Sequence, residues 1–221
     1  MELFTYCRSV AAHRVRIVFN YKAIPYSSKF VRLESDGGAA HQFRALNPQG
    51  LAPVLVHDGQ VITQSMAIME YLEEQVATRP MMPAGCCERA RVRSLAQMFI
   101  SDIQPLHSMR VLRYLRDRQA MSEQQLDKWF EYWIRIGLEA AEVRLSSEPE
   151  TGVYCHGDQP TLADACLVPE VHLAMQRGQD LSAFPTVRRI YRTCMTLGSF
   201  QAAAPETQLD AMPEPVQILS A

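Results

Sequence analysis

The stretch of residues 6–17, YCRSVAAHRVRI, places a cysteine, a serine and three arginines where a short apolar run meets an expected helix. Cys7 stands where a C-x-x-C redox motif would begin, but position 10 is Val10, so the motif is incomplete. Ser9 lies in the small-residue turn that opens the helix. A serine there either caps the helix or, with the unpaired backbone N–H groups, favours a bound anion. The residues alone leave both interpretations open.

The other titratable residues suggest no metal centre. None of the six cysteines forms C-x-x-C, and none has zinc-ligand spacing with a histidine, so we expect free thiols and no metal. Cys166 and Cys194 lie in apolar helical patterns, which predicts that they are buried.

Composition and charge limit the class of protein. The hydrophobic content of 48% is enough for a core, and the formal net charge of −2 gives no general case for nucleic-acid binding. No apolar run approaches the roughly 20 residues that cross a bilayer, and the N-terminus does not resemble a secretory signal. We therefore expect a cytoplasmic protein that does not bind membranes.

Residues 1–78 alternate between strand and helix patterns and predict a small α/β domain. The expected order is strand 2–6, helix 11–22, strand 24–33, helix 39–46, hairpin 52–62 and helix 65–76. Asp58 and Gly59 form the type I′ turn pair of the hairpin, and Ser65 is the expected N-cap of the last helix. On helix 11–22, the spacing assigns Arg14 and Arg16 to the polar side.

Two prolines and a glycine in residues 77–86 indicate a linker, and only helical patterns follow. We expect one long helix bent at Pro105, a second from about Ser122 to Leu145, a third opened by a Thr161–Asp164 capping box, and a fourth over residues 184–197. The helical domain is expected to cover residues 87–204, and the acidic, proline-containing residues 205–221 are expected to be a loose tail.

Four motifs carry a resemblance to a known family: RSVAAHRVRI, LAPVL, TQSMAIMEYLEE and TLADACLVP. Together with this two-part layout, they resemble the cytosolic glutathione transferases, and the first is most similar to the zeta class with its bacterial maleylpyruvate and maleylacetoacetate isomerases. The resemblance implies an α/β plus all-α protein. Its N-terminal domain would be thioredoxin-like and would bind glutathione, and its all-helical C-terminal domain would bind the substrate.

The same resemblance implies roles for individual residues. Ser9 would be catalytic with Arg8 beside it, and Pro53 would follow a cis peptide bond. The expected glutathione-binding residues are His41, Gln49, Ala52, Pro53, Gln64, Ser65, Asp102 and Gln104, the last two across a homodimer interface. Carboxylates of a substrate would be bound by Arg8, Arg110 and Arg177, because a guanidinium binds both oxygens of a carboxylate.

The resemblance implies a cis–trans isomerisation in the catabolism of aromatic compounds, and these residues suit its chemistry. A free thiol has a pKa of about 8.5, and hydrogen bonding from Ser9 at a helix start would favour the thiolate of glutathione. The thiolate adds to an activated double bond of a dicarboxylate, the bond rotates, and the thiolate leaves.

Several alternatives stay open. Val10 and Ala11 replace a serine and a cysteine of the zeta-class turn, and Gln176 stands where an arginine is expected; these departures favour a conjugating or α-halo acid dehalogenating transferase. A non-catalytic glutathione-binding module and a redox role for Cys7 are further alternatives. The polar candidates could also be helix caps or solvated surface residues.

Overall fold

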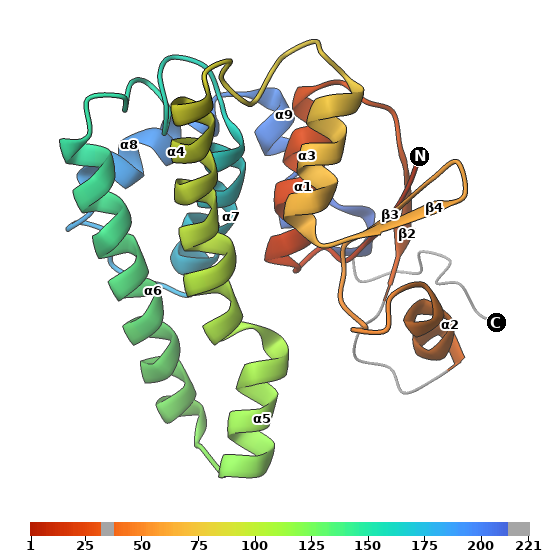
Figure 1. Cartoon of the computed structure of the whole chain (residues 1–221). Coiled ribbons are helices and arrows are strands. Elements are labelled where there is room, and N and C mark those ends of the chain that lie inside the picture. Colours follow the sequence, from red (N-terminus) through yellow and green to blue (C-terminus); the bar gives the residue numbers. More distant parts are fainter. Residues whose placement is uncertain (32–37, 212–221) are drawn as a thin grey trace. The chain divides into compact units, whose positions relative to one another are not determined.

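The computed structural model describes residues 1–31 and 38–211, and the chain divides into two compact units (Figure 1). The first unit comprises Met1–Pro80 and the segment from Met195 onward, and the second is Met81–Cys194. The first is α/β and the second all-helical, which confirms the expected fold class. Residues 195–204 belong to the first unit, whereas the sequence assigned them to the helical domain.

The sheet of the first unit has four strands in the order β2-β1-β3-β4. They are β1 (Glu2–Thr5), β2 (Ser27–Phe30), β3 (Val54–His57) and β4 (Gln60–Thr63). β1 runs parallel to β2 and antiparallel to β3, and β3 and β4 form the hairpin. Asp58 and Gly59 have φ angles of 49° and 77°, as a type I′ turn requires. The expected element order is confirmed; residues 32–33 of the expected second strand lie outside the described residues.

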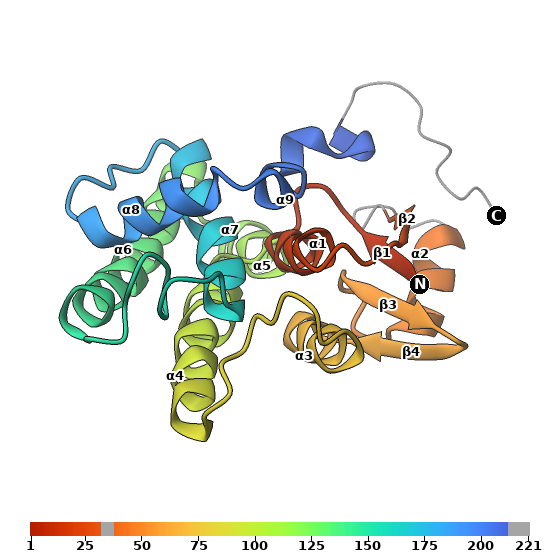
Figure 2. The same ribbon diagram turned by 90° about the horizontal axis from the view of Figure 1, so that it is seen from above.

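Three helices cover the two faces of this sheet. α1 (Val10–Tyr21) and α3 (Ser65–Gln75) lie together on one face, and α2 (Gly38–Leu46) lies on the other (Figures 1 and 2). Phe43 of α2 packs with Phe4 and Val54. Since side chains alternate along a strand, Leu3 and Leu55 point to the opposite face, where both are fully buried. This face sets the positions of α1 and α3.

The C-terminal segment is folded as far as the structure describes it. It forms α9 (Gly198–Gln201) and two 3₁₀ turns, η3 (Pro205–Thr207) and η4 (Leu209–Ala211). The Thr207 hydroxyl donates to the Ala202 carbonyl at 3.0 Å. The expectation of a loose tail is therefore wrong for residues 205–211, because tertiary hydrogen bonds outweigh their polar composition. Residues 212–221 lie outside the described part of the chain.

The second unit is built from helices. They are α4 (Cys86–Gln97), the π-helical turn η1 (Met98–Ile103), the 3₁₀ turn η2 (Gln104–His107), α5 (Met109–Gln119), α6 (Glu123–Ser147), α7 (Leu162–Gln176) and α8 (Pro185–Cys194). The expected single helix bent at Pro105 is instead divided. Pro105 lacks an N–H, so it fits the first turn of a new 3₁₀ segment better than a helix interior.

α7 is the centre of the second unit, packed against α4 and α8. Its start confirms the expected capping box, because Asp164 accepts from the Thr161 backbone N–H at 2.8 Å. The same carboxylate accepts from the Cys155 N–H at 2.8 Å and ties in the preceding loop. Cys166 and Cys194 are fully buried, as predicted.

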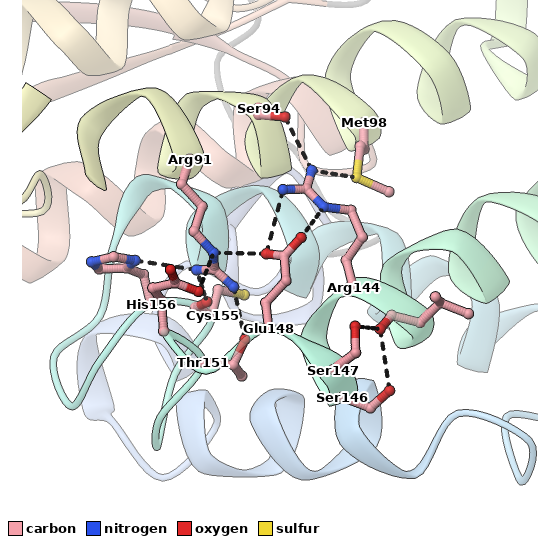
Figure 3. Close-up of polar contacts among 12 residues, drawn as sticks. Arg91, Ser94, Met98, Arg144, Ser146, Ser147, Glu148, Thr151, Cys155 and His156 are labelled. Atoms are coloured by element: carbon pink, nitrogen blue, oxygen red, sulfur yellow. Dashed lines mark hydrogen bonds and ion pairs between the residues drawn. The ribbon is translucent and has the colours of Figure 1, made fainter. Parts of the chain in front are cut away.

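A polar network around Glu148 joins α4 to the end of α6 (Figure 3). Glu148 accepts from Arg144 Nε and from Arg91 Nε, both at 2.7 Å. Hydrogen bonding from Arg144 lowers the pKa of the Glu148 carboxyl, with Arg91 adding to the effect. Arg91 also donates to the Thr151 hydroxyl at 2.8 Å. The network fixes the loop that leads into α7.

Candidate active site

Ser9 is the N-cap of α1. Its hydroxyl oxygen accepts from the Ala12 backbone N–H at 3.1 Å, and its backbone is extended, with φ −78° and ψ 113°. Because the oxygen is the acceptor in this bond, the hydroxyl proton can be donated elsewhere. The first N–H groups of a helix also attract negative charge. Capping and anion stabilisation are therefore compatible roles for Ser9.

Arg14 and Arg16 of α1 are both completely buried, although the sequence assigned them to the polar side of the helix. They lie about 200° apart around the helix axis and so reach different structures. Arg14 donates from Nη1 to the Ser65 hydroxyl at 3.2 Å. Arg16 donates to the carbonyls of Tyr6 and Cys7 at 3.3 and 3.2 Å. These hydrogen bonds to oxygens offset part of the cost of burying the two cations.

The start of α3 differs from that of α1. Gln64 is the residue before the helix and has a φ angle of 69°, while Ser65 is its first residue. The expectation that Ser65 is the N-cap is therefore wrong. The buried hydroxyl of Ser65 accepts from Arg14, so its own proton can be donated to a ligand. A positive φ in a non-glycine residue is uncommon and is often found at binding sites.

The loop before β3 contains three further candidates, Gln49, Ala52 and Pro53, of which Gln49 contacts Gln64. The Gln64 side-chain amide donates to the Gln49 side-chain oxygen at 2.7 Å. Asn47 holds this loop by accepting from the Gln49 N–H at 3.1 Å and donating to the Leu51 carbonyl at 2.8 Å. The Ala52–Pro53 peptide bond is cis, as the resemblance implied, and both residues are buried. The structure thus places Gln49, Gln64 and Ser65, three of the predicted glutathione-binding residues, close together.

Arg8 and His41, the other candidates of the first unit, are both exposed. Arg8 directly precedes Ser9. Because its side chain is exposed, the guanidinium is accessible to a carboxylate from solvent. His41 is on the solvent side of α2. Exposure is compatible with binding and with the solvated-surface alternative for both side chains.

Cys7 is poorly suited to redox chemistry. Its side chain is only 2% exposed, and burial raises the pKa of its thiol, with the nearby Asp210 carboxylate adding to the effect. A reactive cysteine needs an accessible thiolate. The structure therefore favours the interpretation of Cys7 as a buried bystander.

The remaining candidates belong to the second unit. Asp102 is exposed on η1, Gln104 is half-buried at the start of η2, and Arg110 is exposed in the first turn of α5. Arg177 ends α7, where its guanidinium lies over the Phe130 ring at 4.8 Å from the centroid. This stacking favours the structural alternative for Arg177.

Sequence reasoning missed two functional candidates, Arg16 and Asp210. The signal for Arg16 was present, because its neighbours Val15, Ile17 and Val18 leave little room for a wide polar face. Asp210 gave no signal, since it meets Cys7 only through the tertiary fold.

Within residues 1–31 and 38–211, no helix is long and apolar enough to cross a membrane. The same residues contain no group of three His, Cys, Asp or Glu side chains suited to a metal ion.

Comparisons with known proteins identify the family. Residues 8–75 match the model of the glutathione S-transferase N-terminal domain. The chain is 41% identical over 211 residues to a maleylpyruvate isomerase from Ralstonia sp, covering 96% of this chain and 100% of that protein.

Solved structures give the same result. A holo maleylpyruvate isomerase, described as a bacterial zeta-class glutathione S-transferase, superposes with a TM-score of 0.91 at 40% identity, over 95% of this chain and 99% of that chain. A maleylacetoacetate isomerase from Methylobacterium extorquens AM1, solved with malonate and glutathione, has a TM-score of 0.90 at 38% identity, over 94% and 98%. With a serine at the start of α1 and this similarity along nearly its whole length, the chain belongs to the zeta class of the glutathione transferase family.

Proposed function

We propose that this protein is a glutathione-dependent cis–trans isomerase of maleylpyruvate or maleylacetoacetate. The observation that carries the proposal is Ser9 at the start of α1, where its hydroxyl proton can be donated to a sulfur anion. The relative from Ralstonia sp supplies the reaction class. The expected setting is the catabolism of aromatic compounds in the cytoplasm.

The glutathione cradle would be built mainly by the first unit. The γ-glutamyl carboxylate would accept from the Ser65 hydroxyl and from the N–H groups at the start of α3, beside Gln64. The peptide of glutathione would pair with the backbone around Ala52 and Pro53, as an added strand does. Gln49 and His41 would approach the rest of the tripeptide, and Asp102 and Gln104 would reach it from the partner subunit of a homodimer.

When bound, glutathione supplies a thiolate that adds reversibly to the activated double bond and lets it rotate. Ser9 donates a hydrogen bond to the sulfur and so favours its ionised form. The positive end of the α1 dipole at this helix start adds to the stabilisation. Neither group forms a covalent bond with the substrate.

The substrate would be a dicarboxylate, and arginines would bind its carboxylates. Malonate, found with glutathione in the Methylobacterium extorquens relative, is a dicarboxylate. Arg8 is the first candidate because it is exposed directly beside Ser9. Arg110 is the second, and Arg177 the third because Phe130 and Asp127 already engage it.

The test is turnover of maleylpyruvate and of maleylacetoacetate by the wild type with and without glutathione, followed by absorbance. We expect rapid, glutathione-dependent loss of one cis substrate, and loss of that activity in Ser9→Ala. Tight glutathione binding without turnover of either compound would overturn the isomerase proposal.

That negative result would favour a conjugating or dehalogenating transferase. Val10, Ala11 and Gln176 are the departures from the zeta-class pattern that point to this second candidate. Assays with a chloro-aromatic acceptor and with an α-halo acid would then separate conjugation from dehalogenation.

A further inference from the structure

The turn that leads into Ser9 is held by side chains from outside it. The Ser9 N–H donates to the Tyr6 carbonyl at 3.0 Å and closes the turn. Arg16 donates from Nη1 to the same Tyr6 carbonyl at 3.3 Å and from Nη2 to the Cys7 carbonyl at 3.2 Å. The Cys7 N–H donates to the Asp210 carboxylate at 2.8 Å. Both polar groups of the Cys7 backbone are therefore fixed by side chains.

Arg16 connects this turn to two other parts of the first unit. Its Nη1 donates to the Thr5 hydroxyl at 3.1 Å, at the end of β1, and its Nε donates to the Ala203 carbonyl at 3.0 Å, in the C-terminal segment. Burial lowers the pKa of Arg16 to about 10, while the charges of Tyr26 and Asp210 oppose this shift. The guanidinium is thus a cation at neutral pH and holds four groups in a fixed planar geometry.

Asp210 reaches the turn from η4, 203 residues further along the chain. One carboxylate oxygen accepts from Cys7, and the other, Oδ1, is buried without a hydrogen-bond partner among the described residues. An unpaired buried oxygen is unfavourable. The Asp210 carboxylate also acts on the Arg16 guanidinium, whose positive charge it favours, so the two side chains belong to one polar group around the turn.

Ser9 ends this turn, so the conformation of the turn affects the position of the Ser9 side chain. The turn is the only covalent link between β1 and the start of α1, and both of its ends are fixed by the sheet and the helix. Small changes in its peptide planes would move the Ser9 hydroxyl relative to a bound sulfur. Displacements of about 1 Å at a reacting centre can reduce rates by about 100-fold.

We propose that Arg16 and Asp210 form a clamp of two positioning residues, which holds the Tyr6–Ser9 turn in the conformation that lets Ser9 stabilise the glutathione thiolate. The C-terminal segment then contributes to the active site through Asp210. This inference rests on the proposed role of Ser9. It assigns no chemical step to either residue.

The test compares Asp210→Ala, which removes the acceptor, with Asp210→Asn, which keeps a neutral acceptor. The control is Leu209→Ala in the same 3₁₀ turn, because the Leu209 side chain is 61% exposed. The readouts are the pKa of the bound glutathione thiol, from the ultraviolet absorbance of the thiolate, and kcat and KM for the isomerisation.

In Asp210→Ala we expect a higher pKa of the bound thiol and a kcat about tenfold lower, with little change in KM for glutathione. Asp210→Asn should retain most of the activity, and Leu209→Ala should match the wild type. Arg16→Lys keeps the charge but loses the planar fork, so it should resemble Asp210→Ala.

Other results would overturn the clamp. If Asp210→Ala lowers only the melting temperature and leaves the thiol pKa and kcat unchanged, the contact is merely structural. If Asp210→Ala and Asp210→Asn both lower the thiol pKa, the charge of Asp210 matters and the positioning does not. Failure of the wild type to bind glutathione would contradict the proposed function itself, and the same titration distinguishes that failure.

Discussion

The starts of α1 and α3 use a serine in different ways. At α1, Ser9 is the N-cap, its backbone is in an ordinary extended conformation, and its oxygen accepts from the helix. At α3, Ser65 is already inside the helix, the preceding Gln64 has a φ of 69°, and a buried guanidinium donates to the serine oxygen. In both, the oxygen has an internal donor and the hydroxyl proton remains for a ligand.

From the difference between the two helix starts, we expect Ser9 to act in catalysis and Ser65 in glutathione binding. The turn before Ser9 is held at both polar groups of the Cys7 backbone, which suits the positioning role proposed for this turn. Gln64 donates to Gln49, and Ser65 accepts from Arg14. This arrangement suits a binding surface for a carboxylate. Both helix starts are contacted by side chains of α1: Arg14 donates to Ser65, and Arg16 donates to the carbonyls of the turn before Ser9.

The largest expected effect is that of Ser9→Ala on catalysis. Losing the donor to the sulfur should lower kcat by about 100-fold, similar to the loss of one donor that stabilises an anion in other enzymes. The pKa of the bound thiol should rise toward its free value. Steady-state kinetics and thiolate absorbance measure both changes, with Ser27→Ala as the matched control, because Ser27 is the exposed first residue of β2. An unchanged kcat would remove Ser9 from the mechanism.

Ser65→Ala should act on binding instead. Removing a hydrogen bond to a charged carboxylate should weaken glutathione binding about tenfold, with kcat at saturating glutathione nearly unchanged. Calorimetry gives the dissociation constant, and kinetics at saturation gives kcat. If kcat falls as much as in Ser9→Ala, the two helix starts share one role and the comparison fails.

Substitutions of Gln64 should have a smaller effect, on the free energy of unfolding. Because its φ is 69°, Gln64→Gly should be more stable than Gln64→Ala by about 1 kcal/mol, measured by urea denaturation. The order should reverse at Gln60 in β4, where the extended backbone makes glycine the less stable replacement. Equal stabilities of the two Gln64 variants would show that this position is not strained.

The smallest expected effect is that of Cys7→Ala. Activity should stay within about twofold of the wild type, because the buried thiol has a raised pKa and takes no part in the chemistry. In the wild type, iodoacetamide at pH 8 should modify the exposed Cys86 and Cys87 before Cys7, as read by peptide mass spectrometry. Loss of activity in step with Cys7 labelling would revive the redox alternative.

Much of this architecture could be predicted from local sequence. Alternating apolar residues predicted the strands, Asp58-Gly59 predicted the hairpin turn, and the Thr161–Asp164 pair predicted the start of α7, because each signal acts over a few residues. The fate of Pro105 was less predictable. A proline ends a hydrogen-bond pattern, but packing decides whether the chain bends or changes to a π-helix and a 3₁₀ turn.

By itself, the sequence determined the α/β order of the first unit, the helical nature of the second, and Ser9 at a helix start, since periodicity and turn chemistry are local. Only the tertiary structure decided that Arg14 and Arg16 are buried, that Ser65 follows a strained Gln64, and that Asp210 meets Cys7. The reason is physical. A charged side chain is buried only where oxygens from distant segments converge on it, and no local pattern records that convergence.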